Sequence, residues 1–323
     1  MERQSILAVN LLLGGFEPLT TTTAPQWVLT DNSDQIQFPP TTPGGWPKKR
    51  PLVIWHGLGD NYNSSGINKV KEIYGQMHPN MYILSIGLDE SPIFDERRSI
   101  MGNPSNDIEY VCEMLTKNGE LDNGFDAMGF SQGGLFLRAL VQRCPGISVH
   151  NLVTFGSPHM GVLDLPLCSD PGDWICKRRN EYIKRNIWND AIQRTVVPAQ
   201  YFRDPNDMSK YLEKSHLLAD LNNERTINTT YVTKLQALNA LVLISFESDT
   251  TLVPKYSSKF YDISPETGKL INYKTSVPFV NLGLSKLDKE DRIHFYSLPG
   301  EHMEIPEPFF VVIGYEFFGG YPD

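Results

Sequence analysis

The sequence predicts an α/β fold in which a mostly parallel central sheet carries helices on both faces. The main observation is that short β-prone runs alternate with segments whose apolar residues recur at helical spacing. The β-prone runs are residues 51–55, 81–86, 125–128, 151–155, 241–246 and 293–298, and the helical segments include 67–77, 108–115 and 134–143. A chain of 323 residues with 40% hydrophobic content is long enough for one large domain, or for a domain with an insertion. The alternation favours a parallel sheet, because strands separated by helices run in the same direction.

A second observation is the pentapeptide at residues 129–133, which has the form Gly-x-Ser-x-Gly. It lies between a predicted strand and a predicted helix, the context of the nucleophile elbow of an α/β-hydrolase fold. The glycines at both ends leave room for the tight turn, and Gly134 lets the helix begin close to the sheet. Ser131 is therefore the candidate nucleophile.

A serine hydroxyl is a weak nucleophile and needs a neighbouring base. In an α/β-hydrolase the acid and then the histidine follow the serine along the chain, each on a loop after a strand. Of the seven histidines, His302 alone follows the last predicted strand on a loop. Glu247 and Asp249 both follow the strand at 241–246, and Asp249 is preferred because it lies farther along the loop. The predicted catalytic residues are Ser131, Asp249 and His302.

The first predicted strand ends in His56-Gly57-Leu58-Gly59, where an α/β-hydrolase forms half of its oxyanion hole. The backbone amides of Leu58 and Gln132 are the predicted donors, since Gln132 follows the nucleophile. An ordinary turn between a strand and a helix is the alternative interpretation of the glycines. His159 lies on the loop after the strand at 151–155, and we expect it to shape the pocket at the site mouth.

The alternation breaks down between residues 157 and 240, which we interpret as an inserted, mainly helical cap. The hydrolase core is then predicted to consist of residues 51–156 and 241–323, preceded by a signal-like or extended segment at residues 1–50. Aromatic residues recur in the insertion, and Tyr201 and Phe202 are predicted to line an apolar ligand groove under the cap.

The composition limits the kinds of binding partner and the cellular compartment that are expected for the protein. A net charge of −9 argues against a nucleic-acid surface, and no run reaches the roughly 18 apolar residues of a membrane span, so stable membrane insertion is not expected. Four cysteines and two glycosylation sequons, at Asn63 and Asn228, favour a secretory or lumenal compartment. Residues 6–13 resemble a short signal-peptide core but have few positive charges before them. The chemistry of a serine triad requires no metal and no organic cofactor.

Longer stretches carry a family resemblance. Residues 51–60 read PLVIWHGLGD, residues 127–134 read AMGFSQGG, and residues 220–225 read DLNNER. Together with residues 136–145, they make the chain similar to the palmitoyl-protein thioesterase family. That resemblance implies a lumenal, lysosomal-type α/β-hydrolase that removes long-chain acyl groups from cysteines of S-acylated proteins or peptides.

The resemblance also implies roles for particular residues. Ser131, Asp249 and His302 match the triad of the family, and Asn228 matches a glycosylated position. Cys112 with Cys144 and Cys168 with Cys176 match its disulfide positions. The N-terminal segment and the stretch at about 269–287 depart from the family pattern.

Two other functions remain open at this point. A lipase or carboxylesterase that cleaves oxygen esters uses the same triad, because both reactions pass through an acyl-serine. A binding protein on a hydrolase fold is the other alternative, and the presence of all three triad residue types in the right order disfavours it.

Overall fold

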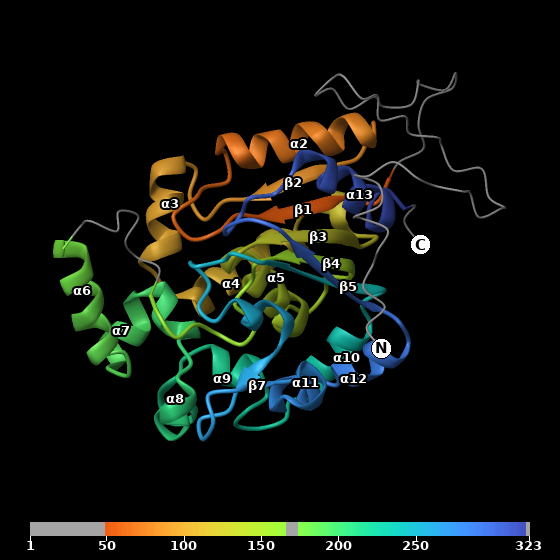
Figure 1. Cartoon of the computed structure of the whole chain (residues 1–323). Coiled ribbons are helices and arrows are strands. Elements are labelled where there is room, and N and C mark those ends of the chain that lie inside the picture. The colour runs from red at the N-terminus through yellow and green to blue at the C-terminus, as the bar shows by residue number, and fades with distance from the viewer. Residues whose placement is uncertain (1–48, 166–173, 321–323) are drawn as a thin grey trace, which may run out of the picture.

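The computed structural model describes residues 49–165 and 174–320 (Figure 1). Six strands form one sheet in the order β2-β1-β3-β4-β5-β8, and every neighbouring pair is parallel. The strands are β1 (Leu52–Trp55), β2 (Ile83–Ile86), β3 (Phe125–Phe130), β4 (Val149–Phe155), β5 (Ala240–Phe246) and β8 (Ile293–Leu298). The predicted parallel α/β fold is confirmed. The signal-like stretch lies outside the described residues.

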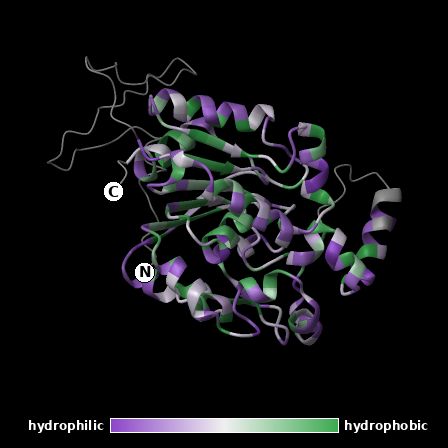
Figure 2. Ribbon diagram, turned by 180° about the vertical axis from the view of Figure 1, so that it is seen from behind, coloured by the Kyte–Doolittle hydropathy of each residue, from purple (hydrophilic) through white to green (hydrophobic). Residues whose placement is uncertain are grey.

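One face of the sheet is covered by α2 (Ser65–Met77) and α13 (Glu307–Phe317), which contact each other. The Ser64 side chain caps α2 by accepting from the Ile67 amide at 3.3 Å. Buried residues recur along α2 at helical spacing and pack with α13 on the apolar side chains of the strands. Figure 2 shows hydrophobic residues gathered on the strands, whereas hydrophilic and hydrophobic residues alternate along α2.

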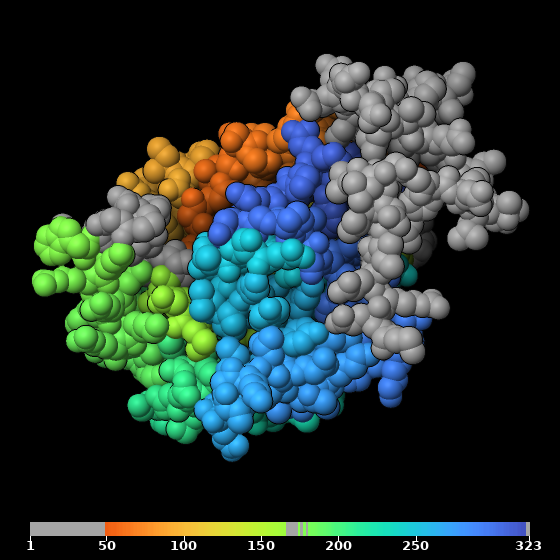
Figure 3. All heavy atoms as spheres, in the orientation of Figure 1, coloured from red at the N-terminus to blue at the C-terminus, as the bar shows by residue number. Residues whose placement is uncertain are grey.

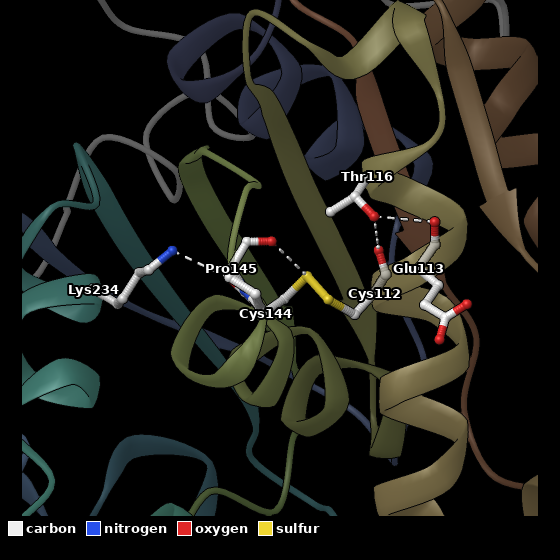
Figure 4. Close-up of a disulfide and its surroundings, with 6 residues drawn as sticks. All are labelled: Cys112, Glu113, Thr116, Cys144, Pro145 and Lys234. Atoms are coloured by element: carbon white, nitrogen blue, oxygen red, sulfur yellow. Dashed lines mark hydrogen bonds between the residues drawn. A yellow bond between two sulfur atoms is a disulfide. The ribbon is translucent and has the colours of Figure 1, made fainter.

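The opposite face is covered by α4 (Pro104–Thr116), α5 (Gln132–Arg143), α10 (Thr229–Gln236) and α12 (Leu284–Lys289). A disulfide joins Cys112 of α4 to Cys144 at the end of α5, which confirms that predicted bridge. In Figure 4, Lys234 of α10 donates to the Cys144 carbonyl, so three helices meet at this point. The second predicted bridge falls outside the described residues, because Cys168 belongs to the segment 166–173.

The chain between β4 and β5 is mainly helical, as predicted. It contains α6 (Trp174–Arg185), α7 (Asp190–Thr195), α8 (Met208–Lys214) and α9 (Leu218–Leu221), together with 3-10 turns η2 (Val197–Tyr201) and η3 (Pro205–Asp207). In Figures 1 and 3 this green segment occupies the lower left of the molecule, beyond the carboxyl ends of the strands. The last helix of the segment, α10, packs on α5 and thus covers the sheet directly. The proposed cap at 157–240 therefore ends in a helix that belongs to the layer around the sheet.

Several elements were not predicted. They are α3 (Pro92–Ile100), α11 (Val277–Asn281), the 3-10 turns η1 (Gly119–Leu121), η4 (Lys255–Lys259) and η5 (Tyr273–Thr275), and the short antiparallel pair β6 (Asp262–Ile263) and β7 (Leu270–Ile271). Helix α3 lacks the apolar periodicity of a packed helix, because its buried residues are Asp95 and Ser99 while Ile93 and Phe94 are exposed. Among the described residues, none of the helices is both long enough and apolar enough to span a membrane.

Candidate active site

The candidate site lies at the carboxyl edge of the sheet, where loops after four parallel strands meet. Ser131 follows β3, Asp249 follows β5 and His302 follows β8. The loop that begins at His56 follows β1, which is hydrogen-bonded to β3. Because the strands are parallel and in register, their loops leave the sheet at one edge, and residues far apart in the sequence come together there.

The elbow around Ser131 is a strained turn. Ser131 has a φ of 49° and a ψ of −121°, outside the regions that non-glycine residues normally occupy. A Cβ on Gly129 would stand 2.3 Å from the Gly134 Cα, and one on Gly133 would stand 2.3 Å from the Trp55 carbonyl oxygen. The flanking glycines are therefore required by the contact between helix α5 and the sheet, and they allow the serine hydroxyl to project from the turn.

Ser131, His302 and Asp249 form a continuous chain of polar contacts. The Ser131 Oγ lies 2.9 Å from His302 Nε2, and His302 Nδ1 lies 2.6 Å from Asp249 Oδ2. The other oxygen of Asp249 accepts from the amides of Thr251 at 3.0 Å and Leu252 at 2.8 Å, which fixes the carboxylate. A proton on Nδ1 satisfies the carboxylate and leaves Nε2 free to accept the serine proton.

The alternative acid, Glu247, is exposed, and its backbone carbonyl accepts from Lys255. The geometry therefore favours Asp249 over Glu247 as the partner of His302.

The two predicted oxyanion donors belong to segments next to Ser131. Gln132 is the first residue of α5, so its amide has no carbonyl four residues earlier in the helix to bond with. Its side chain is buried and held at both ends: Nε2 donates to the Ser99 carbonyl at 2.9 Å, and Oε1 accepts from the Tyr201 hydroxyl at 3.0 Å. The loop with Leu58 passes so close that a Cβ on Gly57 would lie 3.2 Å from the Ser131 Cβ.

A cavity of about 440 Å³ opens beside the triad, within the size range of small-molecule sites. Ser131 and His302 contribute to its wall together with Leu58 and Tyr201. A large part of the apolar lining comes from α2 and from the chain at and before α13: Gly66, Ile67, Val70, Met303, Ile305 and Phe310. The insertion contributes Pro158, Val162 and Tyr201, and β3 contributes Phe130. Within the described part of the chain, no cluster of His, Cys, Asp or Glu is suited to hold a metal ion.

Of the three residues predicted to contact substrate, only Tyr201 lines this cavity. Phe202 is buried away from it, with its ring 5.8 Å from that of Trp188. Tyr201 ends the 3-10 turn η2 and Phe202 follows it in an extended conformation, so the two neighbouring side chains point in different directions. Ile67, Val70 and the segment before α13 were not predicted to line the cavity, because their apolar spacing indicates only packing on the sheet.

His159 is also absent from the cavity wall and is completely buried. Its Nε2 lies 3.0 Å from the Thr154 hydroxyl, and its ring stacks on Phe260 with a centroid distance of 5.0 Å. Burial, and then the positive charge of Arg138, hold the pKa of His159 well below its usual value. His159 is therefore a neutral core residue beneath the insertion, and the expectation that it shapes the site mouth is wrong.

Both predicted glycosylation sites are accessible. Asn63 and Asn228 are exposed. The Asn228 side-chain oxygen accepts from the Thr230 amide at 3.0 Å and thereby caps α10. A glycan is attached to the side-chain nitrogen, so this cap leaves the acceptor atom available, and glycosylation of both residues stays a prediction.

Comparison with known proteins adds a family match. The family model described as palmitoyl protein thioesterase matches residues 51–302. Palmitoyl-protein thioesterase 1 of Caenorhabditis elegans is 38% identical over 264 residues, covering 80% of this chain and 88% of that protein. Lysosomal thioesterase PPT2-B of Xenopus laevis is 27% identical, covering 78% of this chain and 85% of that protein. Among solved structures, the RedJ thioesterase of Streptomyces coelicolor has a TM-score of 0.41 at 14% identity, covering 86% of this chain and 95% of that one.

Proposed function

The chain belongs to the palmitoyl protein thioesterase family, and we propose that it hydrolyses long-chain fatty acyl thioesters of cysteines in proteins or peptides through an acyl-enzyme on Ser131. One observation carries this proposal: the Ser131–His302–Asp249 contacts open onto a cavity whose wall is largely apolar. A hydrolytic triad beside an apolar cavity suits a substrate with a reactive carbonyl and a hydrocarbon chain.

In the first half of the reaction, the Ser131 Oγ attacks the thioester carbonyl carbon while His302 Nε2 takes the hydroxyl proton. The carbonyl oxygen becomes an oxyanion, which accepts from the amides of Leu58 and Gln132. The start of helix α5 adds favourable electrostatic potential at the same point. The carbon–sulfur bond then breaks, and the proton on His302 passes to the departing cysteine sulfur, which leaves as a thiol.

In the second half, a water molecule takes the place of the thiol. His302 accepts a proton from the water as its oxygen attacks the acyl-serine carbonyl. The bond from carbon to the Ser131 oxygen then breaks, and His302 returns the proton to Ser131. Asp249 holds the imidazole in one tautomer through both halves and stabilises its positive charge. The products are a fatty acid and a free cysteine.

The acyl chain is proposed to lie in the cavity along α2 and the segment before α13. Ile67, Val70 and Phe310 are hydrophobic residues there whose exposed surface faces the cavity. Each buried methylene contributes on the order of 0.8 kcal/mol, so a long chain gains several-fold in affinity for each carbon it places in the cavity. Activity should therefore rise from short acyl chains to long ones until the cavity is full.

The experiment that tests this function is side-by-side hydrolysis of palmitoyl thioesters and matched palmitoyl oxygen esters, with a series of acyl lengths for each. We expect kcat/KM to be higher for the thioester and to climb with acyl length. A higher value for the oxygen ester would identify the alternative, a lipase or carboxylesterase. Equal rates for acetyl and palmitoyl thioesters would contradict acyl binding in the cavity.

We also propose that the protein acts in the lysosomal or vacuolar lumen or is secreted. A disulfide is present between Cys112 and Cys144, which is typical of an oxidising compartment. The relative from Xenopus laevis is named a lysosomal thioesterase. Localisation of the tagged full-length protein, with protection from added protease, tests this assignment, and a reduced Cys112 in a cytosolic fraction would contradict it.

A further inference from the structure

Helix α3 carries two buried polar residues beneath the loop that follows β1. Asp95 is fully buried, and its Oδ1 accepts from the Leu88 amide at 2.8 Å while its Oδ2 accepts from the Tyr62 amide at 2.8 Å. Ser99 Oγ accepts from the Gly59 amide at 2.8 Å. These contacts tie the loop to a helix that contributes no reacting group.

The same helix reaches both candidate oxyanion donors. The Ser99 hydroxyl holds the residue after Leu58, and the Ser99 carbonyl accepts from the side chain of Gln132 at 2.9 Å. The position of the Leu58 amide relative to the Gln132 amide is therefore determined partly by one residue of α3. No apolar pattern reveals this role, since the residues involved are polar.

Asp95 also contacts the first residue of the loop. His56 is buried, with Nε2 3.1 Å from Asp95 Oδ2 and Nδ1 2.9 Å from the Gly57 carbonyl oxygen. One side chain therefore connects Asp95 to the backbone of the loop at Gly57.

Asp95 is suited to be the negative partner. Burial by itself raises the pKa of Asp95, but the hydrogen bond and charge of His56 and the amides of Leu88 and Tyr62 outweigh burial and hold that pKa below its usual value. A buried ion pair adds little net stability, because desolvation offsets the attraction. Its effect is to fix geometry, here that of the loop between His56 and Gly59.

We propose that Asp95, together with His56 and Ser99, positions the oxyanion hole: the three residues clamp both sides of Leu58 so that its amide points at the oxygen that becomes charged. This inference rests on the proposed function, because it assigns Asp95 a role in stabilising the oxyanion at Ser131. Asp95 touches no reacting atom and is a positioning residue.

The test is Asp95→Asn in the full chain, which removes the charge with little change in shape. We expect kcat on a palmitoyl thioester to fall about 10- to 100-fold, with KM changed by less than about twofold, since a misplaced donor weakens binding of the transition state alone. The matched control is Asp126→Asn. Asp126 is an equally buried carboxylate at the start of β3, 3.8 Å from Arg50, and it accepts from the Asn151 amide. The control should lose thermal stability but keep kcat.

A second measurement separates positioning from general damage. When an alkyl trifluoromethyl ketone binds, the Ser131 oxygen adds to its carbonyl carbon, the serine proton passes to His302, and the ketone oxygen becomes an oxyanion. Palmitate binds without forming an oxyanion. Asp95→Asn should weaken the ketone in proportion to the loss in kcat/KM and leave palmitate affinity unchanged. Equal weakening of both ligands, or unchanged binding of the ketone, would overturn the proposal.

If Asp95→Asn fails to fold, Ser99→Ala carries the test, because it removes only the hydroxyl that holds Gly59. Ser99→Ala should lower kcat about tenfold, weaken binding of the ketone and leave palmitate affinity unchanged. A wild-type kcat would overturn the proposal. The outcomes also separate the two hypotheses. An active Ser131→Ala variant would remove the proposed function, whereas an inactive Ser131→Ala variant beside fully active Asp95→Asn and Ser99→Ala variants would remove only this inference.

Discussion

The cavity beside Ser131 has two walls of different origin. The core wall consists of Ile67 and Val70 of α2 with Ile305 and Phe310, and it is continuous with the hydrophobic cluster between α2, α13 and the sheet. The insertion wall consists of Pro158, Val162 and Tyr201, which come from the chain after β4.

The two walls contact different parts of the site. The core wall presents hydrocarbon to the cavity, whereas the Tyr201 hydroxyl of the insertion wall donates to Gln132, which follows Ser131. From the sequence, acyl binding was predicted for the insertion alone. We propose instead that the core wall governs selectivity for chain length and that the insertion wall supports the chemistry.

The largest effect on activity should come from substitution of Ser131, which lies beside both walls. Ser131→Ala removes the nucleophile and should lower kcat by more than about 10³-fold for every acyl length, with folding intact. Steady-state rates measured across the acyl series should be equally low for every chain length. The effects of substitutions in the two walls are compared with this loss. A variant that retained a tenth of wild-type activity would show that another residue is the nucleophile. His302→Ala should behave in the same way.

The next largest effect should come from the core wall. Ile305→Asp places a carboxylate at a half-buried lining position and should lower kcat/KM for palmitoyl thioesters about 10- to 100-fold, because several methylenes lose an apolar partner. Acetyl thioester hydrolysis should change little, since a short chain does not reach this position. Val280→Asp is the control, as Val280 is exposed on α11 and absent from the cavity wall. An unchanged preference for long chains in Ile305→Asp would assign chain selectivity to the insertion wall instead.

A third prediction concerns the base of the insertion. The pKa of His159 is lowered by burial and by Arg138, so the unfolded chain binds more protons at this position than the folded chain. Stability from this residue is complete above the unfolded pKa of about 6.5 and is lost as pH falls below it, at up to about 1.4 kcal/mol per pH unit. Urea unfolding between pH 7 and pH 5 should show a smaller pH dependence of the unfolding free energy in His159→Gln. Burial also lowers the pKa values of His78 and His294, so part of the dependence remains.

If His159→Gln keeps the full pH dependence, His159 is not the group that destabilises the fold in acid.

The smallest effect should come from the insertion wall. Tyr201→Phe removes only the hydroxyl that donates to Gln132 and keeps the apolar ring at the cavity. A net hydrogen bond contributes about 1 kcal/mol, so kcat should fall about fivefold and by the same factor for every acyl length. Comparing the acyl series of Tyr201→Phe with that of Ile305→Asp distinguishes the walls most directly. A loss confined to palmitoyl substrates would show that the insertion wall binds the acyl chain.

The sequence alone determined the features that depend on local pattern and on order along the chain. Strand-length β-prone runs alternating with helical segments predicted the parallel sheet, and glycines around Ser131 predicted the elbow. The order serine, acid, histidine pointed to Asp249 and His302, which contact each other beside Ser131 because parallel strands bring their following loops to one edge. Such a chemical requirement can be recognised from the sequence, because only a few residue types satisfy it and their order along the chain is fixed.

Only the tertiary structure decided which side chains face the cavity. Tyr201 and Phe202 are neighbours in sequence, yet one lines the site and the other packs on Trp188. Helix α3 escaped prediction because it is anchored by Asp95 and Ser99 rather than by an apolar stripe. The direction of a side chain, and the partner of a buried polar group, depend on contacts between segments far apart in the sequence. Local periodicity does not encode those contacts.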